Sequence, residues 1–142
     1  SIYVPPNAPM PARTIVDHPD IIKYVAQWGR VGDLGYTLMD HQTPIGAAWL
    51  RLFCEANHGY GFIAPDIPEL TIALRPSYRG RGLGTRLLTH LLQAARPHYA
   101  TVSLSVSRDN PALRLYQRFG FEAVGSHHTA LTMQLVLSDR RF

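Results

Sequence analysis

The sequence predicts a mixed α/β fold, because segments with strand periodicity and segments with helix periodicity follow one another in an irregular order. Residues 69–74 and 101–107 alternate apolar and polar side chains, which is typical of strands. Residues 84–95 instead place leucine and alanine at helical spacing, with one apolar face. The irregular order argues against the regular strand and helix alternation of a doubly wound sheet.

Length and composition indicate one domain. The chain has 142 residues, enough for a single core, so we expect residues 1–142 to form one domain. No apolar run approaches the ~20 residues of a membrane-spanning helix. No secretory signal is visible at Ser1, and what precedes that residue stays open. The single cysteine, Cys54, excludes an internal disulfide, which makes a reduced, cytoplasmic location the default expectation.

The N-terminal half contains an arm, a helix, a hairpin and a loop. Residues 1–13 carry four prolines, which exclude a helix or a central strand and predict an extended arm. A helix is expected over 17–29. The segments 36–39 and 45–53 flank a polar turn and predict a β-hairpin. Residues 55–68 are rich in glycine and proline and have the length of many binding loops.

The C-terminal part follows the strand at 101–107 with a helix and a second hairpin. The short helix opens at Asn110 and ends at Gly120. Residues 121–125 begin a strand, and residues 131–137 alternate as the last one. The order of elements is therefore helix, hairpin, strand, helix, strand, helix, hairpin.

Three glycines at alternate positions, Gly80, Gly82 and Gly84, lie between a strand and the longest predicted helix. Glycine lets backbone amides turn outward and lets a ligand approach without a Cβ in the way. The first N–H groups of the helix have no intrahelical partner, and with the helix dipole they form an anion site. Arg79 and Arg81 add positive charge. The stretch predicts a phosphate-bearing ligand at a helix N-terminus.

Two common phosphate motifs fit this stretch poorly. A P-loop needs a lysine that is absent here, and a dinucleotide fingerprint needs its third glycine one position later. The pattern Arg79-x-x-Gly82-x-Gly84 after a strand instead resembles the acetyl-CoA pyrophosphate loop of the GNAT superfamily of N-acetyltransferases. The alternative interpretation is a glycine-rich turn with solvated arginines.

A second segment also resembles the GNAT superfamily. Asn110-Pro-Ala-Leu-Arg-Leu-Tyr116, followed by Gly120 and Phe121, looks like the signature in which a helix precedes Gly-Phe and a strand. Two signatures in the right order are more specific than either alone. The resemblance covers roughly residues 36–137. The usual first strand and first helix are not evident before it, so the proline-rich arm replaces or follows them, or they are incomplete.

The resemblance implies a fold and a cofactor site. The fold is a central mixed, largely antiparallel twisted sheet with helices on both faces and a splayed cofactor cleft between the two central strands. Acetyl-CoA is the implied co-substrate. Its pantetheine arm would bond to the backbone of β-strand residues and to the Asn110 side chain, and its pyrophosphate to the loop amides. The implied cofactor-binding residues are Ile72, Ala73, Leu74, Arg79, Gly80, Arg81, Gly82, Leu83, Gly84, Thr85, Asn110 and Tyr116.

The implied activity is direct transfer of an acetyl group from acetyl-CoA to a primary amine in a ternary complex. Tyr116 would lie near the thioester sulfur and protonate the leaving thiolate, because a phenol with pKa ≈ 10 keeps its proton at pH 7. Glu69, at the start of the cofactor strand, is expected to be the base that deprotonates the amine. The structural alternatives are a core tyrosine for Tyr116 and a solvated carboxylate at a strand end for Glu69.

Other functions are weighed against this activity. A catalytically silent acyl-CoA sensor or partner-binding domain on the same fold is the main alternative. The net charge of +4 also suits RNA binding, but the basic residues are spread along the chain, and a polyanionic cofactor explains them equally well. Nucleic-acid binding is therefore not expected, and neither is a metal site, because the seven histidines lack paired ligand spacing. The acceptor, the acyl chain and the oligomeric state are not readable, although GNAT proteins often form homodimers.

Overall fold

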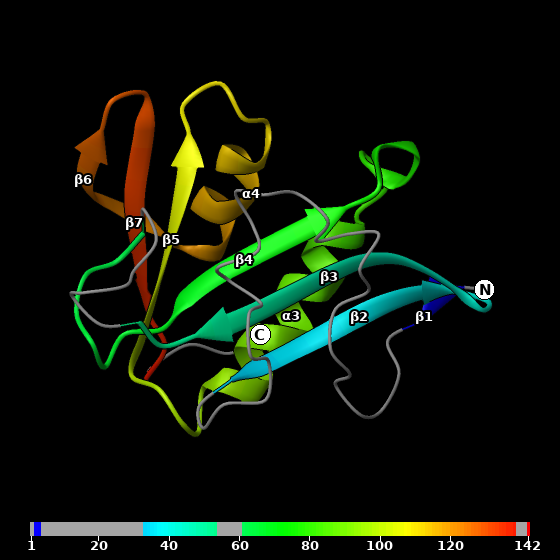
Figure 1. Ribbon diagram of the computed structural model, residues 1–142, viewed down its shortest axis with the longest axis horizontal. Helices are drawn as coiled ribbons and strands as arrows, with labels where there is room; N and C mark the ends of the chain where they lie inside the picture. The colour runs from blue at the N-terminus through cyan, green and yellow to red at the C-terminus, as the bar shows by residue number, and fades with distance from the viewer. Residues whose placement is uncertain (1, 4–32, 54–60, 139–141) are drawn as a thin grey trace.

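The computed structural model describes residues 2–3, 33–53, 61–138 and 142. These residues form one seven-stranded sheet with the strand order β1-β2-β3-β4-β5-β7-β6 (Figure 1). Neighbouring strands are antiparallel, except for the parallel pair β4 and β5. The elements are β1 (Ile2–Tyr3), β2 (Leu34–Asp40), β3 (Thr43–Arg51), β4 (Glu69–Leu74), the 3-10 turn η1 (Pro76–Tyr78), α3 (Leu83–Ala95), β5 (Thr101–Ser107), α4 (Ala112–Phe119), β6 (Glu122–His127) and β7 (Ala130–Val136).

The predicted mixed α/β fold is confirmed, and so is its largely antiparallel sheet. Both predicted hairpins form, as β2–β3 and β6–β7. The N-terminal arm begins with β1, a two-residue edge strand that pairs with the end of β2. The helix predicted over 17–29, the rest of the arm and part of the loop at 54–60 lie outside the described residues. No helix in the described ranges is long and apolar enough to cross a membrane.

The central strands β4 and β5 are joined at one end only. Their register has a single pair, Glu69 opposite Ser103, and the Ser103 backbone N–H donates to the Pro68 carbonyl oxygen over 3.0 Å. Beyond this point the two strands diverge, with β5 turning away from β4 (Figure 1). The divergence leaves the edge of β4 after Leu70 unpaired by β5, which is the splayed arrangement that the GNAT resemblance implied.

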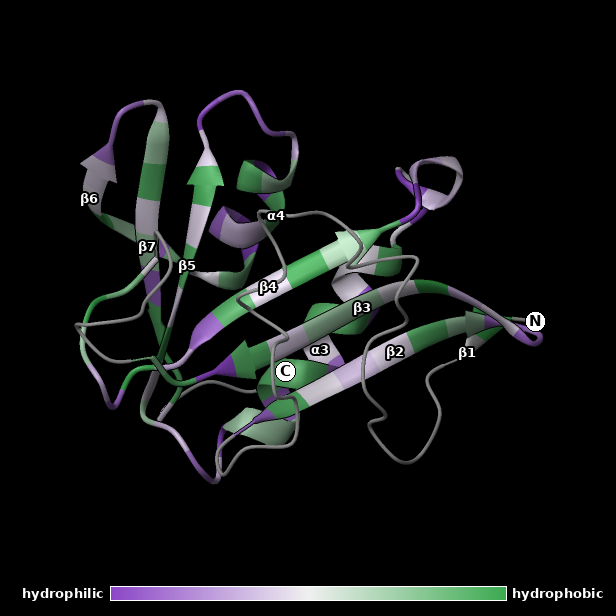
Figure 2. Cartoon of the chain, viewed as in Figure 1, coloured by the Kyte–Doolittle hydropathy of each residue, from purple (hydrophilic) through white to green (hydrophobic). Residues whose placement is uncertain are grey.

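One face of the sheet packs against α3. Every third or fourth residue of this helix is apolar, and its buried side chains are Leu83, Leu87, Leu88, Leu91, Leu92 and Ala95. Gly46 in β3 allows the close packing, because a Cβ there would lie 2.6 Å from Leu74 Cδ1 and 3.3 Å from Leu87 Cδ1. The alternation of hydrophobic and hydrophilic residues along β4 and β5 is visible in Figure 2.

The opposite face is also buried but holds polar groups. Arg51 at the end of β3 forms a two-point ion pair with Asp33, with Nε–Oδ1 at 3.0 Å and Nη2–Oδ2 at 2.6 Å. Their side chains are only 1% and 3% exposed. Glu69 lies directly opposite Arg51 in the β3–β4 register, and Ser103 lies beside it. The closed end of the β4–β5 divergence therefore carries a buried polar cluster of Asp33, Arg51, Glu69 and Ser103.

Candidate functional site

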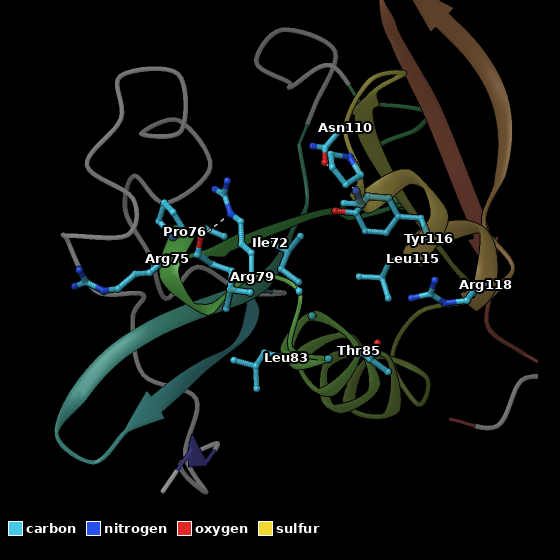
Figure 3. Close-up of a pocket in the computed structure, with 17 residues that line it drawn as sticks. Ile72, Arg75, Pro76, Arg79, Leu83, Thr85, Asn110, Leu115, Tyr116 and Arg118 are labelled. Carbon is cyan, nitrogen blue, oxygen red and sulfur yellow. Dashed lines mark hydrogen bonds between the residues drawn. The ribbon is translucent and has the colours of Figure 1, made fainter.

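A groove with a volume of about 1030 Å³ lies between the free edge of β4 and helix α4. Its floor includes the loop after β4 and the first turn of α3 (Figure 3). Eleven of the twelve residues that the sequence assigned to the cofactor line this groove: Ile72, Ala73, Leu74, Arg79, Gly80, Gly82, Leu83, Gly84, Thr85, Asn110 and Tyr116. The structure therefore brings together segments that are more than 30 residues apart in the sequence.

The loop between β4 and α3 has the backbone that its glycines suggest. Gly80 and Gly82 have φ values of +73° and +75°, in the left-handed region where a side chain is disfavoured. Gly82 is the residue before α3, and no side chain caps the helix there. The first N–H groups of α3 are consequently available to a ligand anion in the groove.

Gly84 has a different role from the other two glycines. It lies inside α3, and a Cβ at this position would lie 3.0 Å from Leu115 Cδ2 of α4. Its small size therefore lets α4 approach the start of α3, which narrows the groove between the two helices.

Arginines stand at both ends of the groove lining. Two belong to the loop and are fixed by backbone carbonyls: Arg75 Nε donates to Pro44 O over 2.8 Å, and Arg79 Nε donates to Leu74 O over 3.3 Å. The third, Arg118, comes from the last turn of α4. Arg81 does not line the groove, because its guanidinium lies 5.1 Å from the centre of the Tyr78 ring. The predicted phosphate contact of Arg81 stays a prediction.

Tyr116 presents a buried phenol to the groove. It is 5% exposed, and its ring meets the Phe121 ring edge-on at 5.9 Å between centroids. Burial raises the pKa of Tyr116 to about 12. Figure 3 shows its hydroxyl pointing from α4 toward the side of the groove that Ile72 occupies. A protonated donor is therefore held over the groove at neutral pH.

Asn110 opens helix α4 and also lines the groove. Its Oδ1 accepts a hydrogen bond from the Ala112 backbone N–H over 2.9 Å, and its carbonyl oxygen accepts one from the Leu113 N–H over 3.0 Å. These bonds use the acceptor atoms of Asn110 to fix the first turn of α4. The side-chain amide remains as a donor for a ligand.

Glu69 does not line the groove. It is 2% exposed and belongs to the buried polar cluster at the closed end of the β4–β5 divergence. The alternative interpretation, a solvated carboxylate at a strand end, is therefore excluded. Its role as a base stays a prediction, and it would have to act on a substrate that enters from the closed end or through a bridging water.

Six groove residues were not assigned from the sequence: Arg75, Pro76, Pro111, Ala112, Leu115 and Arg118. Ala112 and Leu115 have the helical spacing that indicates a core face, so the sequence did not show that they also line the groove. Arg118 follows Tyr116 by two residues, and this proximity was the one signal that pointed to it. In the described ranges, no three histidine, cysteine, aspartate or glutamate side chains cluster as metal ligands would.

Comparison with known proteins identifies the family. Residues 7–121 match the family model of the acetyltransferase (GNAT) family, which covers most of the chain. The chain therefore belongs to the GNAT family of acetyltransferases.

Two curated relatives match parts of the chain. The N-alpha-acetyltransferase RimI of Mycobacterium tuberculosis is 50% identical over 56 residues, which cover 39% of this chain and 34% of that protein. A mycothiol acetyltransferase of Corynebacterium glutamicum is 33% identical over 105 residues, which cover 72% of this chain and 32% of that protein. The chain thus spans about a third of the length of these two relatives.

A solved structure shares the fold. The PaiA N-acetyltransferase of Thermoplasma acidophilum, solved in complex with coenzyme A, matches with a TM-score of 0.63 and 18% identity. The match covers 82% of this chain and 68% of that chain. At this level of identity, the likeness supports the fold alone.

Proposed function

We propose that this protein is an acetyl-CoA-dependent N-acetyltransferase, which transfers the acetyl group to a primary amine by direct attack in a ternary complex. The observation that carries the proposal is the groove, where an unpaired strand edge, a glycine loop at a helix start and a buried phenol meet. Membership of the GNAT family supplies the reaction class. The amine and the ternary complex are the parts proposed here.

The groove residues fit coenzyme A, which supplies an activated acyl group as a thioester. The edge of β4 at residues 72–74 offers backbone groups to the amides of the pantetheine arm, as an added strand would pair. The left-handed loop and the uncapped start of α3 suit a pyrophosphate. The Asn110 amide adds a donor beside the pantetheine position. The pantetheine arm and the pyrophosphate therefore each have matching groups in the wall.

Tyr116 acts on the leaving thiolate. Its pKa of about 12 lies above the ordinary value of ≈ 8.5 for a thiol, so hydrogen-bond donation precedes any complete proton transfer. Full transfer needs the pKa of the phenol to fall when substrates are bound. Donation to a developing negative charge in a buried site lowers the barrier to breaking the thioester bond.

Glu69 is the proposed base for the attacking amine. It lies where β4 and β5 are still joined, at the vertex from which the strands diverge. A carboxylate there is separated from the cofactor groove but is adjacent to the opening between the strands. An alkylammonium acceptor with pKa ≈ 10.4 must lose a proton before it attacks, and Glu69 would accept that proton through water.

The acceptor is proposed only as a primary amine. The names of the two relatives point to different acceptors, an N-alpha position for RimI and mycothiol for the other protein. Peptide α-amines, small amines and lysine side chains therefore all belong in a substrate panel. Cytoplasmic location and homodimer formation stay predictions from the sequence.

Release of coenzyme A from acetyl-CoA, followed with a thiol reagent across such a panel, tests the proposal. We expect amine-dependent release and an acetylated product identified by its added mass. Calorimetric titration with coenzyme A measures the binding step separately. If the protein released no coenzyme A with any amine and did not bind coenzyme A, the proposed function would be refuted.

The second candidate is a catalytically silent acyl-CoA sensor on the same fold. The observation that favours it is the burial of Glu69 outside the groove, since an enzyme needs a base within reach of the amine. A sensor would bind coenzyme A in the calorimeter and release none with any acceptor. Amine-dependent turnover would exclude it.

A further inference from the structure

Arg118 differs from the other arginines in the groove. Arg75 and Arg79 use Nε to bind backbone carbonyls, as described above. Within the described part of the chain, the Arg118 guanidinium donates no hydrogen bond and forms no ion pair, and its side chain is exposed. It therefore presents five N–H donors and a full positive charge to the groove.

The position of Arg118 separates it from the glycine loop. Arg79 of the loop and Arg118 at the end of α4 lie on opposite sides of the groove (Figure 3). Thr85, in the first turn of α3, lies on the same side of the groove as Arg118 and is exposed there. The groove thus has two separate places suited to an anion, and the pyrophosphate accounts for one of them.

We infer that Arg118, with the Thr85 hydroxyl, binds the 3′-phosphate on the ribose of coenzyme A and makes the groove selective for the phosphorylated cofactor. This inference rests on the proposed function and specifies one subsite of it. Arginine suits a phosphate monoester, because its planar guanidinium donates two parallel hydrogen bonds to two phosphate oxygens. A serine or threonine hydroxyl at a helix start adds a neutral donor without competing charge.

Arg114 provides a matched control. It lies one turn before Arg118 on the same exposed side of α4, but it lines a separate hollow of about 350 Å³ with Arg108 and Asp109. Replacing either arginine removes the same charge from the same helix. Of these two arginines, only Arg118 lines the groove, so only its replacement should affect recognition of the 3′-phosphate.

The experiment compares the dissociation constants of coenzyme A and 3′-dephospho-coenzyme A by calorimetry, for the wild type, Arg118→Gln, Arg118→Lys and Arg114→Gln. We expect the wild type to prefer coenzyme A by about 5- to 20-fold at low salt, the range of a solvent-exposed, charge-assisted contact. Arg118→Gln should lose this preference by binding coenzyme A more weakly, with unchanged affinity for the dephospho form. Arg118→Lys should keep part of the preference, and Arg114→Gln all of it.

Three results would overturn the inference. The wild type could bind both forms equally, Arg118→Gln could weaken both forms equally, or Arg114→Gln could remove the preference as fully as Arg118→Gln. Each of these leaves coenzyme A binding, and so the proposed function, intact. Binding of neither form would refute the proposed function and this inference together. Melting curves without ligand check that the variants are folded. We expect unchanged melting temperatures, because the replaced side chains are exposed and do not pack in the core.

Discussion

The hydroxyl of Tyr78 donates a hydrogen bond to Asp40 Oδ2 over 2.6 Å. Asp40 ends β2, and Tyr78 ends the η1 turn, so this contact ties the hairpin of β2 and β3 to the loop that precedes α3. The same loop contains the left-handed glycines that expose backbone amides to the groove. The hydrogen bond lowers the pKa of the Asp40 carboxyl and raises that of the Tyr78 phenol. Both shifts keep the contact formed across the neutral pH range.

Tyr78→Phe should weaken coenzyme A binding by about two- to fivefold, as expected for the loss of one supporting hydrogen bond. The variant keeps the aromatic ring beneath Arg81, so it removes only the tie to Asp40. The melting temperature should change little because the phenylalanine ring keeps the packing of Tyr78 and the lost hydrogen bond is only part-buried. Calorimetric titration measures the affinity.

Asp40→Asn should have a similar effect on coenzyme A affinity, and the double variant should be no weaker than the single ones, because both act through one contact. Additive losses in the double variant would show that the contact is not what positions the loop. Since the pKa of Asp40 is lowered, its carboxylate is present above its ordinary pKa, and the tie weakens only as the pH falls through the lowered value.

Tyr116→Phe should lower kcat by about 10- to 100-fold, with the dissociation constant of coenzyme A changed by no more than about twofold. The phenol hydroxyl acts on the leaving thiolate, whereas the ring that packs on Phe121 stays in place. Tyr36→Phe is the control: this tyrosine lies on β2, packs near His90 and does not line the groove. An unchanged kcat in Tyr116→Phe would remove the assignment of Tyr116 as the donor.

The buried phenol also predicts a loss of stability in alkaline solution. The pKa of Tyr116 is about 12 in the folded protein, against an ordinary value of 10.0. Because the folded pKa is raised, the stability is complete below pH 10 and falls as the pH rises toward 12. A difference of about two pKa units, at ~1.36 kcal/mol each, corresponds to about 2.7 kcal/mol.

Urea unfolding of the wild type at pH 9 and pH 11 measures this loss. About half of the 2.7 kcal/mol should already be lost at pH 11. Tyr116→Phe lacks the titrating group and should lose less over the same interval, while the other tyrosines contribute equally to both proteins. The same pH dependence in the two proteins would contradict the buried, neutral phenol.

Much of the fold follows from local patterns in the sequence. The strands β5 and β7 were predicted because their apolar and polar side chains alternate. Helix α4 was predicted from its apolar spacing between Asn110 and Gly120, and Gly120 indeed takes the left-handed conformation that ends a helix. The glycine loop was predicted because positive φ values and exposed amides are local properties. The eleven cofactor residues that line the groove were instead implied by the resemblance to the GNAT superfamily, whose two signatures lie in these segments.

The parts that were not predicted depend on contacts across the fold. Whether Arg118 faces the groove depends on how closely α4 approaches α3, which Leu115 and Gly84 set across about 30 residues of sequence. Arg81 turns to Tyr78 because of the loop conformation. The burial of Glu69 depends on the register that places it opposite Arg51 and beside Ser103. No periodicity in one segment carries this information.

Glu69→Gln tests whether Glu69 is the base. If Glu69 accepts the proton of the amine, the variant should lower kcat by about 10- to 100-fold near neutral pH, and the loss should shrink at high pH, where the acceptor is already neutral. Coenzyme A affinity should stay the same, because Glu69 lies outside the groove. Glutamine keeps the shape of the side chain within the buried polar cluster.

Glu122 is an exposed glutamate at the start of β6, and the variant Glu122→Gln controls for the loss of one carboxylate. It should retain full kcat at every pH. A pH-independent loss in Glu69→Gln, accompanied by a lower melting temperature, would mean that Glu69 stabilises the cluster around Arg51 and that another group accepts the proton. If Glu69→Gln kept full activity and an unchanged pH profile, Glu69 would not be the base, and the amine would lose its proton to solvent before it binds.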